Sequence, residues 1–244
     1  YFHSANNNGE IPPVAVLLLG DHSTNMSLGI PAETIVSSYS GNYITDNGYA
    51  DVDGDNLPDI CFSRLVAANA DEAQKMVNKT LDYEYYHPNM DASTYQNPIT
   101  ALGWQTDRWF QICSEAVGGY WRNQGKTPIR INAIYSGTPV NTWSTAQNTS
   151  FVANYFGPNG RGYIPSTPNE LGGWTGGTAQ QVVNALNNGA FILQHCDHGF
   201  ETGWGKPEFN TTYVESLTNV NKMTFLVCND CSTGMFNLNS EDCL

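Results

Sequence analysis

The sequence predicts an α/β protein with a mostly parallel sheet. Two apolar runs in the last third of the chain, 190–194 and 223–227, each end in a cluster of Cys and Asp residues, joined in the first run by His residues. A helical pattern lies between them, and the two strands of such a strand–helix–strand unit run parallel. Another unbroken apolar run, 14–19, is typical of a strand buried on both faces of a parallel sheet.

The first part of the chain, residues 1–90, begins with this apolar run and has a second expected strand at 60–62. Asn69, followed three residues later by Glu72, resembles a capping box and predicts the start of a helix. The apolar stripe of that helix continues until shortly before the next proline, which cannot extend a helix.

The middle of the chain, residues 91–175, is rich in Pro, Gly, Asn and Trp. We expect strands near 109–113 and 129–135. The remainder of this part is expected to form long loops, and such loops commonly build substrate pockets.

The last part, residues 176–244, has the clearest pattern. Thr178 is expected to cap a helix with an apolar face, and Gly189 to end it. The first of the two apolar runs follows as a strand, then a short helix near 212–217, then the second run. This order is a βαβ unit.

The composition excludes some classes of function. The formal net charge is −13, with 10 basic against 23 acidic residues, and a nucleic-acid-binding protein needs clustered Lys and Arg. No apolar run approaches the ~20 residues that span a bilayer. An acidic surface with few lysines favours a secreted or cell-surface protein. No signal-peptide pattern opens the sequence, so we expect the numbering to begin after processing or truncation.

The βαβ unit brings His198 and Cys231 to one edge of the sheet, because parallel strands end on the same side. Cysteine attacks as a thiolate, and a nearby imidazole can take the thiol proton and later protonate a leaving amine. The N–H groups of Gly199 and Cys231 can form an oxyanion hole, since glycine lets a substrate carbonyl approach closely. These residues predict nucleophilic catalysis.

Other interpretations of these residues remain open. His195, His198, Cys228 and Cys231 have the chemistry of a zinc site, although strand alternation sends His195 and its neighbour Cys196 to opposite faces. Cys228 and Cys231 form a C-x-x-C pair, which in redox proteins normally opens a helix. We expect His195 to be a packed or hydrogen-bonded neighbour of the site. Cys61, Cys113 and Cys228 are expected to be buried bystanders.

An acidic segment in the first part of the chain resembles a calcium loop. Asp51, Asp53, Asp55 and Asp59 alternate with other residues, and the Leu57 carbonyl is a further candidate ligand. The bidentate Glu that closes such a loop at its twelfth position is absent. A solvated acidic turn without metal is the alternative. If Ca²⁺ binds, we expect it to be structural.

The motifs around the two candidate catalytic residues are similar to those of a known family. The chain contains Asp197-His198-Gly199, Glu201-Thr202-Gly203-Trp204-Gly205 and Leu217-Thr218-Asn219 before Cys231. Earlier in the chain it contains Leu18-Leu19-Gly20-Asp21-His22, Phe62-Ser63-Arg64 and Tyr83-Glu84-Tyr85. Together these segments resemble the gingipain family of cysteine peptidases over roughly residues 14–243.

The resemblance implies a caspase/gingipain-like α/β/α sandwich with Cys231 as nucleophile and His198 as its partner. It further implies that Glu115 is the acid that orients the His, and that Trp204 contributes to substrate binding beside Gly199. The acidic specificity residue of the family has no counterpart, because Trp121, Arg122 and Lys126 occupy that region. We therefore do not expect strict cleavage after Arg or Lys.

Family members have further strands before and after the segments matched here. We therefore expect this chain to hold a partial catalytic domain, which another chain or a missing segment completes. The expected function is a secreted cysteine endopeptidase that acts on proteins or peptides through a thioester. The alternative is a non-catalytic surface or adhesion module stabilised by calcium, or a pseudoenzyme of the same fold. Six tryptophans could bind glycans or peptides in either case: Trp104, Trp109, Trp121, Trp143, Trp174 and Trp204.

Overall fold

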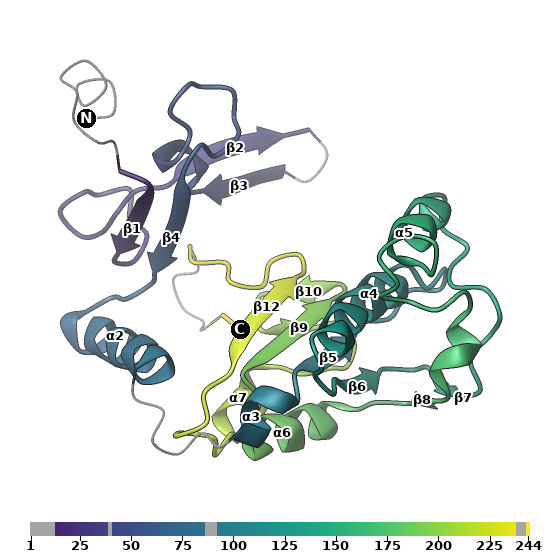
Figure 1. Cartoon of the computed structure of the whole chain (residues 1–244). Coiled ribbons are helices and arrows are strands. Elements are labelled where there is room, and N and C mark those ends of the chain that lie inside the picture. Colours follow the sequence, from purple (N-terminus) through teal and green to yellow (C-terminus); the bar gives the residue numbers. More distant parts are fainter. Residues whose placement is uncertain (1–12, 39–40, 86–91, 238–242) are drawn as a thin grey trace. The chain divides into compact units, whose positions relative to one another are not determined.

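The structure is a computed structural model, and it describes residues 13–38, 41–85, 92–237 and 243–244. The chain forms two compact units, coloured from purple to blue and from teal to yellow in Figure 1. The first comprises Tyr1–Leu81 with Phe236–Asn239, and the second comprises Asp82–Met235 with Ser240–Leu244. The middle and last parts expected from the sequence lie in the same unit.

The first unit contains two pairs of strands. β1 (Ala15–Leu19) pairs in parallel with β4 (Cys61–Leu65), at the places where the apolar runs predicted strands. The prediction that the first strand is buried on both faces is wrong: Leu17 is 62% exposed, and Leu18 is the buried residue of the strand. Among the described residues, β1 pairs with one strand, β4, so one of its edges has no strand beside it. The second pair is the hairpin of β2 (Glu33–Ser37) and β3 (Gly41–Thr45), followed by η1 (Asn47–Tyr49).

Helix α2 (Ala70–Glu84) begins at the predicted cap. The backbone N–H of Glu72 donates to the Asn69 side chain at 3.0 Å, and the Glu72 carboxylate accepts the N–H of Ala68 at 2.8 Å. The Glu72 N–H is a donor of the first turn that has no partner within the helix, and the Ala68 N–H lies just before the helix; both are thereby satisfied.

The second unit is built on a four-stranded sheet in which all neighbouring strands are parallel. The expected strands at 129–135, 190–194 and 223–227 are present with slightly shifted bounds. The central strand β5 was not predicted, although all four of its residues are buried. The order across the sheet is β12 (Phe225–Asn229), β9 (Ile192–Cys196), β5 (Ile99–Leu102) and β6 (Ile129–Asn132).

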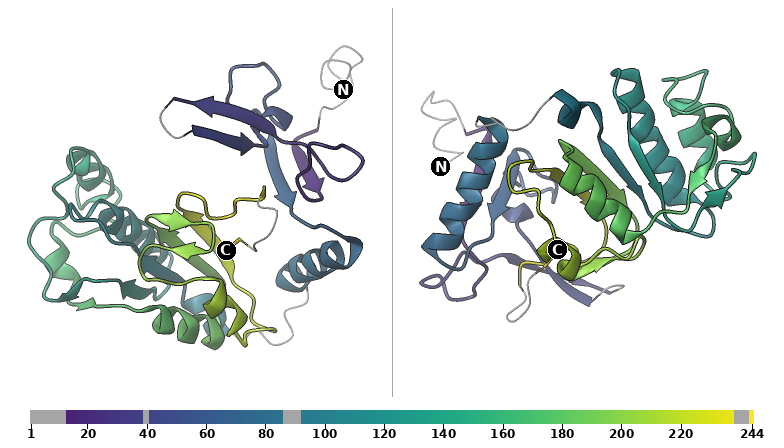
Figure 2. Two further views of the ribbon diagram at one scale, coloured as in Figure 1. Left: turned by 180° about the vertical axis from the view of Figure 1, so that it is seen from behind. Right: turned by 90° about the horizontal axis from the view of Figure 1, so that it is seen from below.

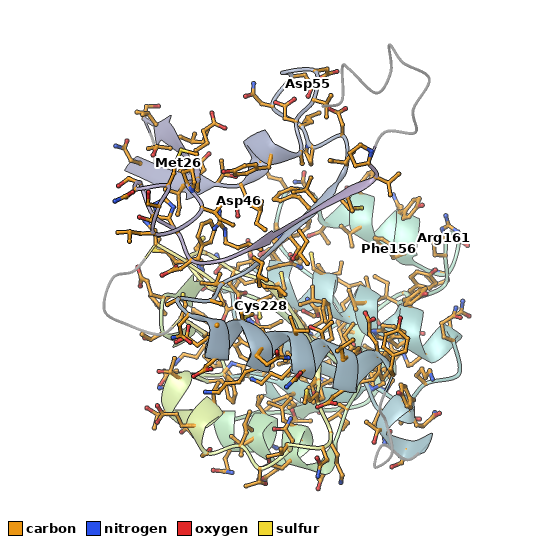
Figure 3. The ribbon with its side chains drawn as sticks, turned by 90° about the vertical axis from the view of Figure 1, so that its left-hand side faces the viewer. Met26, Asp46, Asp55, Phe156, Arg161 and Cys228 are labelled. Carbon is orange, nitrogen blue, oxygen red and sulfur yellow. The ribbon has the colours of Figure 1, made fainter. Side chains whose placement is uncertain are left out.

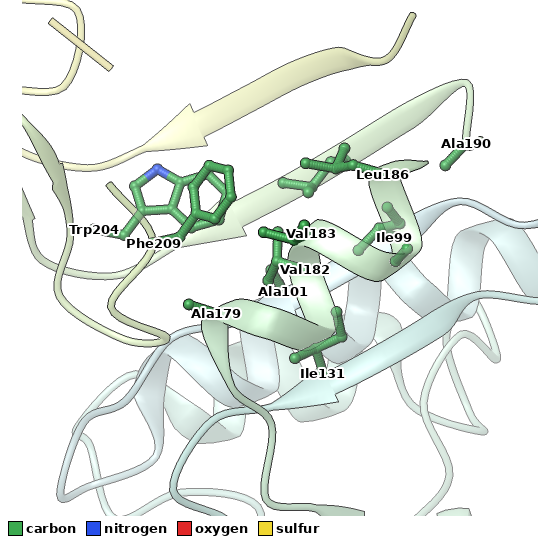
Figure 4. Packing of buried hydrophobic residues seen from close by; sticks show 12 residues of the cluster. Ile99, Ala101, Ile131, Ala179, Val182, Val183, Leu186, Ala190, Trp204 and Phe209 are labelled. Atoms are coloured by element: carbon green, nitrogen blue, oxygen red, sulfur yellow. The ribbon is translucent and has the colours of Figure 1, made fainter. Parts of the chain in front are cut away.

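Helices cover both faces of this sheet (Figure 2). On one face, α6 (Ala179–Asn188) packs Val182, Val183 and Leu186 against the sheet, as Figure 4 shows. Thr178 caps this helix in a capping box with Gln181, and Gly189 ends it at φ 95°, as predicted. On the other face, α4 (Trp109–Asn123) packs against β5 and β9. The second unit is therefore an α/β/α sandwich.

The strand predicted at 109–113 is instead the first part of helix α4. Gly118 and Gly119 both lie within this helix, although glycine weakens helices. Gly119 is required by packing: a Cβ at this position would clash with the backbone carbonyl of Tyr163, which crosses the helix there. The tertiary contact therefore overrides the local propensity.

The remaining elements of the second unit are short. They are α3 (Ala92–Gln96), β7 (Ser136–Gly137), α5 (Thr149–Phe156), η2 (Pro168–Leu171), β8 (Trp174–Thr175), β10 (Gly199–Phe200), β11 (Gly203–Trp204) and α7 (Thr211–Glu215). Among the described helices of both units, none has the length and apolar character needed to cross a membrane.

Candidate active site

The two predicted catalytic residues follow neighbouring strands at equivalent positions. β9 and β12 pair in parallel with Cys196 opposite Asn229, and His198 and Cys231 each come two residues later. Adjacent strands lie ~4.8 Å apart, so the structure brings the two residues to the same edge of the sheet. A Cβ on Gly199 would lie 2.6 Å from the carbonyl oxygen of Cys231, so the turn after His198 lies against the backbone of Cys231.

Accessibility separates Cys231 from the other thiols of this region. Both Cys231 and His198 are exposed to solvent. Burial raises the pKa of Cys196 to about 12 and that of Cys228 to about 11, so both thiols remain protonated at neutral pH. Cys228 is labelled in Figure 3, on strand β12. The prediction that Cys61 is buried is wrong, because it is exposed in the first unit.

His198 has a partner that the sequence did not reveal. Its Nε2 lies 3.0 Å from the side-chain oxygen of Gln105, and the edge of the Phe110 ring packs on the imidazole at 5.3 Å between centroids. The Gln105 carbonyl accepts the hydroxyl of Tyr135 at 2.5 Å, which fixes this loop. Gln105 follows β5, and it was missed because that strand was missed. The available signal was a short β-branched and apolar run closed by Gly103.

The structure does not bring Glu115 to His198, contrary to the sequence-based expectation. The Glu115 carboxylate is buried beneath α4, where it pairs with the guanidinium of Arg130 at 2.7 Å. Arg130 is opposite Thr100 in the sheet, and Thr100 is opposite Gln194 on β9. His198 lies four residues beyond Gln194, which corresponds to ~13 Å along a strand. The carboxylate therefore stabilises the packing of helix on sheet.

Trp204 also differs from its predicted role. It is 2% exposed, and its ring stacks on His195 with centroids 4.1 Å apart and an interplanar angle of 9°. The ring also packs on Phe209 at 4.9 Å between centroids, in the core cluster that Figure 4 shows. A buried ring of this kind cannot bind substrate directly, so Trp204 supports the site from below.

The residues that stand in the family's specificity region lie at the far edge of the sheet. The Trp121 ring packs on Phe191 at 5.2 Å, and the Lys126 ammonium lies 5.6 Å from the same ring. Phe191 precedes β9, whereas His198 follows it. Neither Trp121 nor Lys126 is therefore placed to line a pocket at the His198 edge.

A buried ion pair lies beside the candidate dyad. The His195 and Asp230 side chains are both fully buried, with Nδ1 of His195 2.9 Å from the Asp230 carboxylate. The other ring nitrogen, Nε2, lies 2.9 Å from the Lys206 carbonyl oxygen. Since both nitrogens of His195 are occupied, it has none to offer zinc, which argues against the zinc interpretation. The redox interpretation also lacks support, because Cys228 lies within strand β12 and does not open a helix.

Asp197, the residue immediately before His198, is tied to the loop that contains Lys206. Its carboxylate accepts the backbone N–H of Lys206 at 2.6 Å. Burial raises the pKa of the Asp197 carboxyl. Gly103 faces this residue closely, and any side chain at position 103 would clash with it. The backbone around His198 is thus held from two sides.

The acidic loop of the first unit gathers three of its predicted ligands. Oxygens of Asp51, Asp53 and Asp59 all lie within 4.8 Å of one another. The Asp59 carboxylate accepts the N–H of Val52 at 2.7 Å, so the loop is already folded around it. Asp55, labelled in Figure 3, lies outside this group. Three carboxylates in such an arrangement have the hard oxygen donors that Ca²⁺ prefers.

The remaining candidate ligand of that loop is the backbone carbonyl of Leu57. The Leu57 N–H donates to the Asp55 carboxylate at 2.8 Å, so these two residues form a turn of their own. Among the described residues, the acidic side chains that gather closely enough to hold a metal are Asp51, Asp53 and Asp59.

The sequence profile of peptidase family C25 matches residues 1–244. The chain belongs to this family. Gingipain R2 of Porphyromonas gingivalis is 23% identical over 227 residues, which cover 91% of this chain and 24% of that protein. Lys-gingipain HG66 of the same species is 23% identical over 242 residues, covering 97% of this chain and 11% of the relative. The resemblance inferred from the sequence motifs is thereby confirmed.

Solved structures confirm the fold of this C25 chain. The crystal structure of the Arg specific cysteine proteinase gingipain R aligns with a TM-score of 0.64 and 20% identity, over 99% of this chain and 45% of that one. A structure titled "Structure of Protease" aligns with a TM-score of 0.65 and 21% identity, over 99% and 43% of the two chains. The chain therefore spans about a quarter or less of these curated relatives and less than half of these solved chains.

Proposed function

We propose that this C25 chain carries the catalytic dyad of a cysteine endopeptidase, with Cys231 as nucleophile and His198 as its proton-transfer partner. The observation that carries the proposal is the strand register, which sets both residues two positions beyond the Cys196–Asn229 pair. Family membership supports the same chemistry. Protein or peptide substrates follow from it.

The contacts of His198 suggest which nitrogen acts as the base. The Gln105 side-chain oxygen can accept a hydrogen bond only if Nε2 carries the proton. The lone pair is then on Nδ1, which takes the thiol proton of Cys231. The thiolate adds to the scissile carbonyl, the amine leaves with the proton from His198, and water hydrolyses the resulting thioester with His198 as general base.

Two backbone N–H groups are available for the oxyanion of the tetrahedral intermediate. The Gly205 N–H donates to the His198 carbonyl at 2.6 Å, and Gly199 is opposite Trp204 in the β10–β11 ladder. Bonded and non-bonded pairs alternate in an antiparallel ladder, so the Gly199 N–H faces away from β11. We assign it, with the Cys231 N–H, to the oxyanion hole. One such donor lowers the barrier by roughly 3 kcal/mol.

The surroundings of the site favour a broad substrate preference. A hollow of about 410 Å³ opens where β6 ends, and its lining includes Lys206 and Glu208, which form an ion pair, but neither His198 nor Cys231. Trp121, Arg122 and Lys126 supply no acidic specificity residue. We therefore propose cleavage that is not restricted to Arg or Lys.

Three further features complete the proposal. A structural Ca²⁺ bound by Asp51, Asp53 and Asp59 would neutralise the acidic loop. Secretion or exposure at the cell surface is supported by the net charge of −13 and the scarcity of lysine. Another segment or chain would contribute to the catalytic domain, because the matched part of gingipain R is 45% of that chain.

The test is labelling with a peptidyl acyloxymethyl ketone, which reacts with an activated cysteine. We expect the probe to modify Cys231, and His198→Ala to reduce the rate at least about a hundredfold, since a general base contributes about 10²–10⁴-fold. Cys61→Ala is the matched control, because Cys61 is the other exposed thiol among the described residues. Equal labelling of both thiols, unchanged by His198→Ala, would favour the non-catalytic module.

A further inference from the structure

The buried pair of His195 and Asp230 lies next to the proposed dyad and takes no part in the chemistry described above. We propose that Asp230 and His195 are positioning residues, which hold the ends of β9 and β12 in the register that the dyad needs. This inference rests on the proposed function. It assigns to two fully buried side chains a role in the rate of the reaction.

Asp230 bridges the two chain segments that carry the dyad. It immediately precedes Cys231, and its Oδ1 accepts the backbone N–H of Asp197 at 3.0 Å. Asp197 in turn immediately precedes His198. One carboxylate therefore ties together the residues adjacent to the nucleophile and to the base. The Thr233 hydroxyl, 3.4 Å from Oδ2, contacts the same carboxylate from the other side of Cys231.

His195 extends this connection to a third segment. Nδ1 contacts the Asp230 carboxylate at 2.9 Å and Nε2 contacts the Lys206 carbonyl at 2.9 Å, so both nitrogens face oxygen acceptors. The Trp204 ring stacks on the imidazole with centroids 4.1 Å apart. His195 therefore connects Asp230, the Lys206 backbone and Trp204.

The contacts close into a ring. The Lys206 carbonyl accepts from His195, while the Lys206 N–H donates to the Asp197 side chain at 2.6 Å. Asp230 contacts both His195 and the Asp197 backbone. These four residues thus link β9, the 205–210 loop and the turn at Cys231. The side chains of the central pair, His195 and Asp230, are fully buried. Such a network fixes backbone positions more tightly than any single bond within it.

A double-mutant cycle tests the inference by measuring the rate at which iodoacetamide alkylates Cys231. In the unmodified chain, His198→Ala should lower this rate at least about tenfold, because the imidazole no longer takes the thiol proton. Asp230→Ala should lower it about as much. Adding His198→Ala to Asp230→Ala should then change little, because residues that act as a unit are not additive.

Each outcome of the cycle is decisive. If His198→Ala retains its full effect in the Asp230→Ala background, the positioning role is overturned and the dyad stands. If His198→Ala has no effect even in the unmodified chain, both the dyad and the positioning role fail. A loss of the His198 effect confined to the Asp230 background supports the inference.

Two further variants guard against simple unfolding. Asp230→Asn keeps an oxygen for the Asp197 N–H but loses the charge opposite His195, and we expect an intermediate alkylation rate from a chain that unfolds cooperatively on heating. Asp46→Asn is the matched control: it removes the charge from another buried ion pair, Arg64–Asp46, whose side chains are 4% and 5% exposed in the first unit. It should destabilise the chain and leave the His198 effect intact. If Asp46→Asn weakens that effect as much as Asp230→Asn does, the role of Asp230 is merely structural.

Discussion

Two buried carboxylates in the second unit, Glu115 and Asp230, each pair with a basic side chain but stabilise different parts of the structure. Beneath α4, the Glu115 carboxylate accepts two hydrogen bonds from the guanidinium of Arg130. The Asp230 carboxylate contacts Nδ1 of His195 and, in addition, accepts the backbone N–H of Asp197, the residue before His198. The first pair fastens a helix to a sheet; the second fixes the backbone on which the dyad is built. Burial and charge alone do not distinguish these roles, whereas the backbone bond does.

The largest effect is expected for Glu115→Gln, which tests whether the Glu115–Arg130 pair is purely structural. We expect the free energy of unfolding to fall by about 1–3 kcal/mol, because the variant weakens a charged hydrogen bond and leaves the Arg130 charge unpaired. Peptide hydrolysis per folded molecule should stay the same. Urea unfolding and initial rates at matched folded concentration measure the two quantities.

The role implied by the family resemblance predicts the opposite result for that variant. An acid that orients His198 would cost at least about a hundredfold in rate when neutralised. A loss of that size at full folded concentration would show that Glu115 reaches His198 during catalysis, and the comparison between the two pairs would break down.

A smaller effect is expected from Gln105→Ala, which removes the observed partner of His198. One hydrogen bond is worth about 1 kcal/mol, so kcat should fall about fivefold to tenfold with little change in KM. Gln96→Ala is the control, since its side-chain amide contacts the Gly125 carbonyl, away from the dyad. An unchanged kcat for Gln105→Ala would mean that another group orients the imidazole.

The last prediction concerns stability alone, at carboxylates that receive no cation from the protein. Among the described ion pairs none involves Asp51, Asp53 or Asp59. Ca²⁺ at about ten times its Kd should stabilise the chain by about 1.4 kcal/mol, which raises Tm by about 3–6 °C, and chelation should reverse the shift.

Asp59→Asn should abolish this calcium effect, since it keeps the oxygen that accepts the Val52 N–H but loses the charge. Asp82→Asn changes net charge equally and lies on a different element, α2. If Asp82→Asn removed the calcium shift and Asp59→Asn preserved it, the loop would be an acidic turn without a metal.

Sequence reasoning succeeded where local and tertiary signals agree. The cap at Thr178, the stop at Gly189 and the two apolar runs around them define the βαβ unit, and parallel pairing then places His198 near Cys231. It also identified His195 correctly as a hydrogen-bonded neighbour. All of these follow from rules that act within a few residues or between consecutive elements.

Sequence reasoning failed where distant backbone segments decide the outcome. Gly119 lies in a helix because Tyr163 crosses it, and Gly103 is required because Asp197 lies against it. Missing β5 also hid Gln105. The assignment of Glu115 depended on a sequence match through this same region, and no local pattern revealed that Arg130 would take its carboxylate. The sequence therefore showed that position 115 carries an acid, but not that Arg130 is its neighbour in space.

The pairing of β9 with β12 has a consequence for insertions and deletions. Along a strand, side chains alternate between faces with a period of two. One residue added between Asn229 and Cys231 would move the sulfur away from the position that the strand register sets, two residues beyond the Cys196–Asn229 pair, even though His198 and Cys231 would both still be present. In the proposed peptidase such an insertion would abolish catalysis without removing either residue of the dyad, so the spacing after the last residue of β12 is as much a part of the proposed site as the thiol itself.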